Sequence, residues 1–237
     1  MVHEPVHEPV PEPVPPAAAV ADALVRLGRV PRVAPGALHR LVAGAPIAGP
    51  AVPCRHSGSV DLFLEAIERA EPGSILVIDN AGRLNEGCIG DLTVSEAAAA
   101  GIVGMVVDGC HRDEAELRRI GLPIWSRGSM PVGPLGGRTG PADRLLRARI
   151  GDVMVTPDDF VVADDDGVLF LAAGEADEAF RIAAEIVAAE RTQAERLAAG
   201  ASLREQLGFD DYMERRRSDP AYDFRRHLRE SGGAIET

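Results

Sequence analysis

The sequence predicts an α/β protein in which parallel strands alternate with helices. Between residues 46 and 126, short runs rich in Val and Ile alternate with segments of helical periodicity. Turn residues such as Pro72-Gly73 separate these segments, and this order is typical of α/β folds. A chain of 237 residues, 46% of them hydrophobic, is long and apolar enough to bury the core of one domain. Because only 4% of the residues are aromatic, that core must consist mostly of Ala, Val, Leu and Ile.

The N-terminal residues 1–16 form a Val-His-Glu-Pro repeat that becomes proline-rich. Repeated prolines prevent both helix and strand pairing, so we expect a solvated tail of polyproline-II type. His3 and His7 are interpreted as part of this tail rather than as metal ligands. The ordered domain, residues 17–200, is expected to begin with a helix through 21–24 that ends at Gly28.

The middle of the chain supplies the alternating elements. The helix expected over 59–70 is amphipathic, and its inward-facing residues are Val60, Leu62, Phe63, Ile67 and Ala70. Residues 80–90 are rich in glycine and polar residues and are expected to form a loop. The expected elements are, in order, a strand over 46–53, a helix over 59–70, strands and helices alternating over 75–79, 92–100, 102–108 and 114–120, and a strand over 123–126.

The C-terminal part begins with an irregular segment, 127–147. Short strands are then expected over 152–156, 160–163 and 167–171, followed by a helix over 175–199. The acidic run 164–167 lacks the spacing of a calcium loop and is interpreted as a tight turn. The charged extension 201–237 contains a large share of the few aromatic residues, so we expect it to dock on the body or on a neighbouring subunit. These aromatic residues are Phe209, Tyr212, Tyr222 and Phe224.

The composition excludes several kinds of chemistry. The chain has no lysine, so it has no side-chain amine for a Schiff base and no P-loop lysine. Its net charge of −12 argues against non-specific binding to nucleic acid. The three cysteines form no close pair, which disfavours disulfides and a structural zinc site and favours a reducing cytoplasm. No signal peptide or membrane span is recognised.

The most informative residues lie in two segments, 87–93 and Arg112-Asp113, each at the carboxyl end of a predicted strand. Gly90 allows a ligand to approach the backbone, and the following helix begins with free amides that suit a carboxylate. Arg112 is a fixed cation for a carboxylate or an oxyanion, and Asp113 is a hard oxygen ligand for Mg²⁺ or Mn²⁺. The three amides are those of Leu92, Thr93 and Val94. Together these groups predict a pocket for a 2-oxo acid.

Twenty residues separate Asp91 from Arg112-Asp113. The same motif, an Asp followed after twenty residues by Arg-Asp, occurs in the aldolases of one family. The chain therefore resembles the family that contains 4-hydroxy-4-methyl-2-oxoglutarate aldolase and the RraA-type regulators of ribonuclease E. The resemblance covers residues 17–200, and the presence of Asp91 favours an enzyme over a regulator. Further matching segments are Pro35-Gly36, Gly49-Pro50-Ala51-Val52, Pro72-Gly73, Val106-Val107-Asp108-Gly109, Gly121-Leu122-Pro123 and 162–168.

The resemblance implies a single RraA-like domain of the β/β/α swivelling phosphohistidine type, with a helical C-terminal extension, assembled as a trimer or hexamer. It implies that Asp113 binds Mg²⁺ or Mn²⁺ and that Arg112 stabilises the pyruvate enolate. Asp91 then orients the water that accepts the proton of the substrate hydroxyl, and Gly90 with the three amides binds the carboxylate. Acidic residues of a neighbouring subunit are expected to approach the metal, with Asp22 and Glu190 as candidates.

The predicted function is therefore that of a class II, metal-dependent pyruvate aldolase. It would cleave a 4-hydroxy-2-oxo acid such as 4-hydroxy-4-methyl-2-oxoglutarate, with oxaloacetate decarboxylase as a side activity. One alternative is a non-catalytic regulator of ribonuclease activity. Another is a lyase, decarboxylase or isomerase of specialised metabolism that uses the same enolate site. Arg83, His111 and the long C-terminus are the features that support this alternative.

Simpler interpretations also exist for single residues of the motif. Asp91 is a favoured residue type for capping the helix that follows it, a role that is compatible with catalysis. His111 is interpreted as a supporting or surface histidine, and Cys88 as a small buried hydrophobic residue rather than a nucleophile. A methyltransferase is excluded because no glycine-rich loop for a methyl donor follows the first strand.

Overall fold

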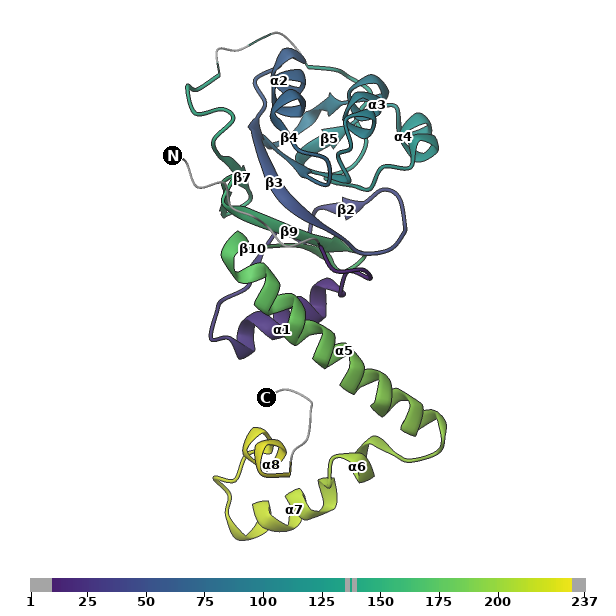
Figure 1. The fold of residues 1–237 in the computed structure, drawn as a ribbon, viewed down its shortest axis with the longest axis vertical. Coiled ribbons are helices and arrows are strands. Elements are labelled where there is room, and N and C mark those ends of the chain that lie inside the picture. The colour runs from purple at the N-terminus through teal and green to yellow at the C-terminus, as the bar shows by residue number, and fades with distance from the viewer. Residues whose placement is uncertain (1–9, 135–136, 138–139, 232–237) are drawn as a thin grey trace.

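The computed structural model describes residues 10–134, 137 and 140–231, and Figure 1 shows a curled sheet with helices around it. The helices are α1 (Ala17–Arg26), α2 (Asp61–Arg69), α3 (Asp91–Ala99), α4 (Glu114–Ile120), α5 (Ala176–Ala198), α6 (Leu203–Gln206), α7 (Phe209–Ser218) and α8 (Phe224–Ser231). The strands are β1 (Arg32–Val33), β2 (His39–Arg40), β3 (Ile47–Arg55), β4 (Ile75–Ile89), β5 (Gly104–His111), β6 (Ile124–Ser126), β7 (Ala148–Ile150), β8 (Val153–Val155), β9 (Asp159–Asp164) and β10 (Gly167–Ala172). The predicted α/β class with a helical C-terminal extension is confirmed.

The main sheet has eight strands in the order β1-β10-β9-β3-β4-β5-β6-β2. The pairs β3-β4, β4-β5 and β5-β6 are parallel, and the other pairs of this sheet are antiparallel. Although β1 and β2 form opposite edges, only residues 34–38 separate them in the chain. The indole Nε1 of Trp125 on β6 donates to the carbonyl oxygen of Asp164 on β9 at 2.9 Å. The sheet is therefore curled so that its two ends come close together.

Alternating side chains of the strands pack on the two faces of this curled sheet. On β4, Ile75 and Val77 point to the interior, where they meet Phe170 of β10. Their neighbours Leu76 and Ile78 point outward into the cluster covered by α2, α3 and α4. A third cluster lies under α1 and α5. Because strand side chains alternate between faces, this packing determines the register of the strands.

Two buried aspartates fasten the β7–β8 hairpin to the sheet. Asp79 on β4 and Asp108 on β5 are register partners and are both buried. The Oδ2 atom of Asp79 accepts from the Arg149 amide at 3.1 Å, and that of Asp108 accepts from the Gly151 amide at 3.0 Å. Arg127 donates from Nε to Oδ1 of Asp108 at 2.6 Å. The sequence did not predict β7, which lies between the expected irregular segment, 127–147, and the strand expected over 152–156.

The prediction of a loop over residues 80–90 is wrong, because most of this segment continues β4. It pairs with β5 through Arg83↔Gly109, Gly87↔Cys110 and Ile89↔His111, with register shifts between these pairs. Left-handed backbone at Ala81 and Gly82 allows the strand to leave the ladder and rejoin it. The strand expected over 102–108 likewise extends to His111.

At the N-terminus, residues 10–16 form neither helix nor strand, but they are not fully solvated. Pro15 is buried, and Val10 and Val14 pack on the cluster under α1 and α5. Residues 1–9, with His3 and His7, lie outside the described residues. The acidic turn at 164–167 is confirmed, since Asp164 and Gly167 are partners in the β9–β10 hairpin.

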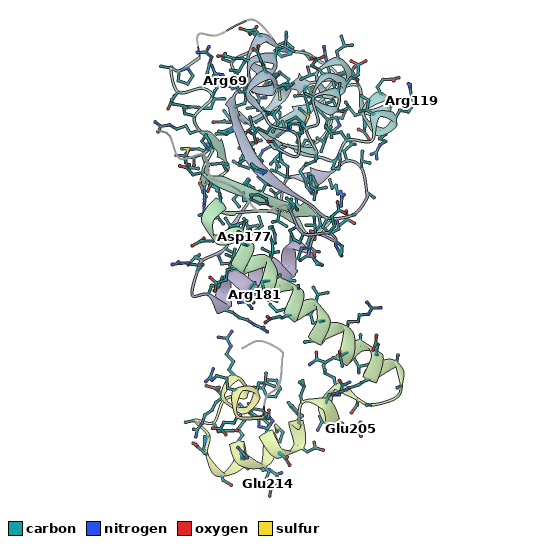
Figure 2. The ribbon with its side chains drawn as sticks, viewed as in Figure 1. Arg69, Arg119, Asp177, Arg181, Glu205 and Glu214 are labelled. Atoms are coloured by element: carbon teal, nitrogen blue, oxygen red, sulfur yellow. The ribbon has the colours of Figure 1, made fainter. Side chains whose placement is uncertain are left out.

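The C-terminal extension forms an arm of three helices beyond the far end of α5 (Figure 1). Figure 2 shows Glu205 and Glu214 on this arm, at the opposite end of the molecule from Arg69 and Arg119. Aromatic rings hold the arm together, with Tyr212 and Phe224 centroids 4.9 Å apart. Among the described residues, no helix has both the length and the apolar character needed to cross a membrane.

We predict that Gly49→Ala destabilises the fold by about 1–3 kcal/mol, as overpacking of a core does. A Cβ atom at Gly49 on β3 would lie 2.1 Å from the carbonyl oxygen of Gly73, and backbone cannot move aside as a side chain can. Gly36→Ala is the matched control, because its Cβ would meet nothing within 4 Å. Urea unfolding of both variants tests this, and equal midpoints would contradict it.

Candidate active site

Two loops meet at the carboxyl ends of the neighbouring parallel strands β4 and β5. Ile89 and His111 are register partners, and the Arg112 amide donates to the Ile89 carbonyl oxygen at 2.9 Å. The Asp91 amide lies 3.4 Å from Oδ2 of Asp113. The strand pairing therefore brings together the three residues that the sequence analysis predicted, although twenty residues separate Asp91 from Arg112.

Glycines provide the space in which Arg112 and Asp113 lie. A Cβ atom at Gly90 would be 2.4 Å from Oδ2 of Asp113 and 3.1 Å from Nε of Arg112. At Gly87 it would be 3.0 Å from Cβ of Arg112, and at Gly133 it would be 2.7 Å from Nη1. Any larger residue at these positions would have to displace the arginine or the carboxylate.

Asp113 has a left-handed backbone, with φ 59° and ψ 36°, at the N-cap position of α4. Aspartate tolerates this conformation better than most residues. Its Oδ2 atom lies 3.4 Å from Nε of Arg112, and the two side chains are 38% and 46% exposed. The carboxylate and the guanidinium are thus both accessible to a ligand.

The first turn of α3 differs in part from the prediction. The helix begins at Asp91, whose Oδ1 accepts from the Leu92 amide at 2.8 Å. The Val94 amide donates to the Gly90 carbonyl oxygen at 3.1 Å, and its side chain is fully buried in the core. Val94 is therefore a correction, since its amide is used within the helix. Of the three predicted amides, only that of Thr93 donates no hydrogen bond to a described residue.

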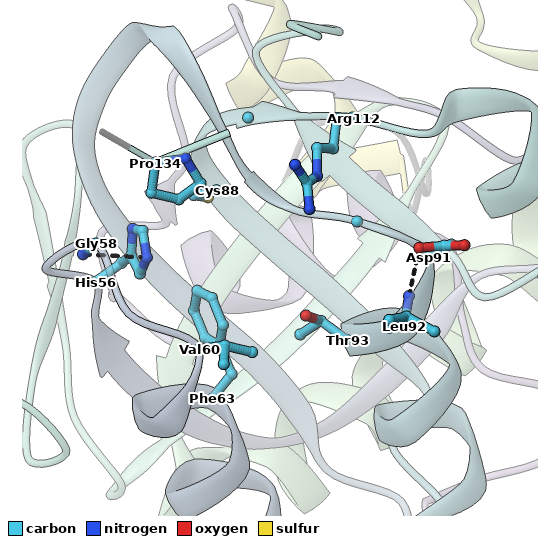
Figure 3. A pocket seen from close by; sticks show the side chains of 12 residues that line it. His56, Gly58, Val60, Phe63, Cys88, Asp91, Leu92, Thr93, Arg112 and Pro134 are labelled. Atoms are coloured by element: carbon cyan, nitrogen blue, oxygen red, sulfur yellow. Dashed lines mark hydrogen bonds between the residues drawn. The ribbon is translucent and has the colours of Figure 1, made fainter. Parts of the chain in front are cut away.

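Gly90, Asp91, Leu92, Thr93 and Arg112 line a pocket of about 240 Å³, shown in Figure 3, whereas Val94 and Asp113 are not among its lining residues. Arg112, Asp91 and Thr93 lie on one side of it. The described residues that line it are His56, Gly58, Val60, Phe63, Gly87, Cys88, Gly90, Asp91, Leu92, Thr93, Arg112 and Pro134. Sequence analysis missed His56 and assigned Val60 to the core, but Val60 is 54% exposed. The signal that points to both residues is their position just after the carboxyl end of β3, beside β4.

His56 contributes a wall to the pocket. Its Nε2 atom accepts from the Gly58 amide at 3.2 Å, which places the ring proton on Nδ1, 2.8 Å from Oδ1 of Asn80. The ring stacks on Phe63 with centroids 4.8 Å apart and an angle of 15° between the planes. Both ring nitrogens are thus engaged by the chain itself.

Arg83 stabilises this wall through contacts with His56 and its partner Asn80. Its Nε atom donates to Oε1 of Glu86 at 2.6 Å, and the Glu86 side chain is only 4% exposed. Its Nη2 atom donates to Oδ1 of Asn80 and, at 3.3 Å, to the His56 carbonyl oxygen. The charge of Arg83 is therefore compensated by Glu86 and not directed at a ligand.

Two further groups near the pocket are held in their neutral forms. Burial lowers the pKa of His111, with the Glu114 carboxylate opposing this in part, and its Nδ1 lies 2.7 Å from Oγ of Ser126. Burial also raises the pKa of the Cys88 thiol, and the Glu86 carboxylate adds to that shift. Both observations support the interpretation of these residues as structural.

Asp22 and Glu190 are exposed on α1 and α5, the helices that cover a different cluster from the one under α3 and α4. Within one chain they do not reach the pocket. Nor does the described part of the chain contain any group of three or more His, Cys, Asp or Glu that could hold a metal ion. The hard oxygens of Asp113 and Asp91 suit Mg²⁺, which keeps several waters, better than zinc.

Residues 17–170 match the family model described as RraA-like, Aldolase/RraA. Two relatives carry the name "Putative 4-hydroxy-4-methyl-2-oxoglutarate aldolase". That from Albidiferax ferrireducens is 40% identical over 102 residues, 43% of this chain and 57% of the relative. That from Halalkalibacterium halodurans is 33% identical over 119 residues, 50% of this chain and 56% of the relative. The matched parts thus span little more than half of either relative.

Among solved structures, Streptomyces coelicolor RraAS2 is described as an unusual member of the RNase ES inhibitor RraA protein family. It is 30% identical to this chain, with a TM-score of 0.63, and the match covers 78% of this chain and 91% of that one. The predicted RraA-like fold is thereby confirmed. Since the family model spans more than half of the chain, this protein belongs to the RraA-like (Aldolase/RraA) family.

Proposed function

We propose that this protein is a divalent-metal-dependent carbon–carbon lyase that releases pyruvate from a 4-hydroxy-2-oxo acid. The observation that carries this proposal is that Gly90, Asp91 and Arg112 line one pocket and that the Asp113 carboxylate lies against Gly90 beside it. The names of the two aldolase relatives support it. Oxaloacetate decarboxylation is proposed as a side activity, because it passes through the same pyruvate enolate.

Arg112 is the proposed catalytic cation. When the bond between C3 and C4 of the substrate breaks, negative charge develops on the keto oxygen. A fixed guanidinium beside that oxygen stabilises the enolate, as a protonated imine does in lysine-dependent aldolases. The chain has no lysine, so an imine cannot form. The Thr93 amide at the start of α3 binds the substrate carboxylate, aided by the positive end of the helix.

Asp113 is proposed to hold Mg²⁺ or Mn²⁺, with water completing the coordination. When bound, this cation supplies Lewis-acid polarisation of the keto group. Asp91 orients the water that accepts the proton of the C4 hydroxyl as the bond breaks. The pyruvate enolate then takes up a proton at C3, which completes the release of pyruvate.

We further propose a homo-oligomer, a trimer or hexamer, whose catalytic unit is the domain of residues 17–200. In such an assembly Asp22 and Glu190 of a neighbouring subunit approach the pocket, and the arm formed by α6, α7 and α8 docks on a neighbour. A reducing cytoplasm suits this chain, because its three cysteines are buried and unpaired. The proposed partner is a small 2-oxo acid, not nucleic acid or a membrane.

Pyruvate release from oxaloacetate and from 4-hydroxy-4-methyl-2-oxoglutarate, coupled to lactate dehydrogenase, tests this function. With Mg²⁺ present we expect release that EDTA abolishes. Arg112→Ala is expected to lower kcat/KM by about 10²–10³-fold, the typical effect of removing an oxyanion donor. Asp113→Asn is expected to abolish the metal response, and asparagine tolerates the left-handed backbone at this position.

Arg119→Ala is the matched control, because this arginine is 72% exposed on the same helix, α4. Its activity should equal that of the unchanged protein. No release from either compound by a folded oligomer with Mg²⁺ would contradict the aldolase proposal. It would favour the ribonuclease regulator or a lyase for another substrate.

We also predict that Gly90→Ala lowers kcat/KM by at least about 10²-fold, the effect expected when a catalytic group moves by 1 Å. The new Cβ would start 2.4 Å from Oδ2 of Asp113 and would force that carboxylate aside. The affinity for Mn²⁺, measured by calorimetry, should fall in parallel. Gly36→Ala again serves as the control, and unchanged activity of Gly90→Ala would show that the close approach is not required.

A further inference from the structure

After β6 the chain continues beside β5 as residues 127–133, here called the strap. The amide of its first residue donates to the Gly109 carbonyl oxygen at 2.8 Å, and Ser129 forms a parallel bridge with His111. The strap therefore runs along the carboxyl end of β5. The residue that follows it, Pro134, lines the pocket (Figure 3).

His111 holds the strap to β5 through both its backbone and its side chain. Its amide donates to the Gly128 carbonyl oxygen at 3.0 Å, and its carbonyl oxygen accepts from the Met130 amide at 2.8 Å. Its Nδ1 atom lies 2.7 Å from Oγ of Ser126, which also accepts from the Gly128 amide at 3.3 Å. Since His111 directly precedes Arg112, the strap is fixed to the strand end that carries the arginine.

The strap also packs on β4 at Gly87. The Gly87 amide donates to the Val132 carbonyl oxygen at 2.7 Å, and a Cβ atom at Gly87 would lie 2.6 Å from the Met130 carbonyl oxygen. Backbone of the strap and backbone of the strand are thus in direct contact. Hydrogen bonds to β5 and close packing on β4 hold the strap in place, because backbone cannot move aside as the end of a side chain can.

The last residue of the strap, Gly133, lies against the guanidinium of Arg112. A Cβ atom at Gly133 would be 2.7 Å from Nη1, and one at Gly90 would be 3.1 Å from Nε. The strap and the turn before α3 thus both limit where the guanidinium can lie, although the Arg112 side chain is 46% exposed. Such limits matter for a catalytic group, since a displacement of about 1 Å can cost about 10²-fold in rate.

We propose that the strap positions the Arg112 guanidinium for the enolate oxygen, and that Gly133 is the positioning residue. The inference deepens the proposed function, on which the role of Arg112 rests. Gly133 acts through its lack of a side chain, which leaves room for the guanidinium beside a fixed backbone. His111 and Gly87 act one step further away, because they fix that backbone to β5 and β4.

Gly133→Ala tests this role. Gly133 does not have a left-handed backbone, and the described atoms within 4 Å of the new Cβ are Nη1 and Cζ of Arg112. Because the end of an arginine can move aside, the midpoint of urea unfolding should stay unchanged while the guanidinium is displaced. Exchange of the methyl protons of pyruvate with D₂O reports enolate formation. With Mg²⁺ we expect it to slow by about 10²-fold.

Gly36→Ala is the matched control, because its Cβ would meet no described atom within 4 Å. It should exchange at the rate of the unchanged protein.

The same substitution in Arg112→Ala separates positioning from general damage. If Gly133 acts through Arg112, adding Gly133→Ala should change the residual exchange of Arg112→Ala by less than about twofold. Two independent defects would instead multiply, and the double variant would be about 10²-fold slower than Arg112→Ala. That result, an undiminished rate in Gly133→Ala, or loss of the folded state in this variant would overturn the inference.

Binding of oxalate keeps this test separate from the proposed reaction. Oxalate has the charge and the planar shape of the pyruvate enolate, and calorimetry with Mg²⁺ present gives its Kd. We expect Gly133→Ala to raise the Kd at least about tenfold, and Arg112→Ala and the double variant to have equal Kd values. No exchange by the unchanged protein would overturn the proposed function. The oxalate affinities would then decide the inference, and equal Kd values for Gly133→Ala and the unchanged protein would overturn it.

Discussion

The parallel pairing of β4 with β5 is the constraint on which the whole site depends. The register that places Ile89 beside His111 also brings Gly90 within reach of Arg112 and Asp113. This register is not set by the site, because strand residues alternate between the curled interior and the cluster under α2, α3 and α4. A slip of one residue would exchange the two faces, so core packing keeps Gly90, Arg112 and Asp113 in place.

The proposed chemistry of the pocket depends on the absence of lysine as well as on the presence of Arg112 and Asp113. In the proposed reaction, a chain without lysine would stabilise the enolate through Arg112 and a cation held by Asp113, and the Arg112 Nε and Asp113 Oδ2 atoms lie 3.4 Å apart. The second arginine that the sequence places nearby, Arg83, is neutralised by the buried Glu86 and braces the wall that contains His56. Among the described residues that line the pocket, Arg112 thus faces a wall that contains Val60 and Phe63, and the accessible guanidinium underlies the proposed function.

Much of this could be predicted from the sequence, because hydrophobic periodicity and turn residues are local signals. The alternating elements and the proximity of Asp91 to Arg112 followed from them. The continuation of β4 through residues 80–89 could not be predicted, since a segment rich in glycine and polar residues looks like a loop until its partner strand is known. Val60 was assigned to the core because the helical pattern was extended back to residue 59. The helix α2 in fact begins at Asp61, which leaves Val60 exposed at the rim of the pocket. The use of the Val94 amide within α3 depends on where the helix begins, which sequence patterns define only to within a residue or two.

The central claim is that Arg112 and a metal at Asp113 stabilise the enolate of pyruvate. Exchange of the methyl protons of pyruvate with D₂O, followed by NMR, tests this directly, because it needs no knowledge of the group carried by C4. We predict exchange that requires Mg²⁺, stops with EDTA and slows by about 10²–10³-fold in Arg112→Ala. Exchange that is absent with Mg²⁺, or undiminished in Arg112→Ala, would contradict the claim.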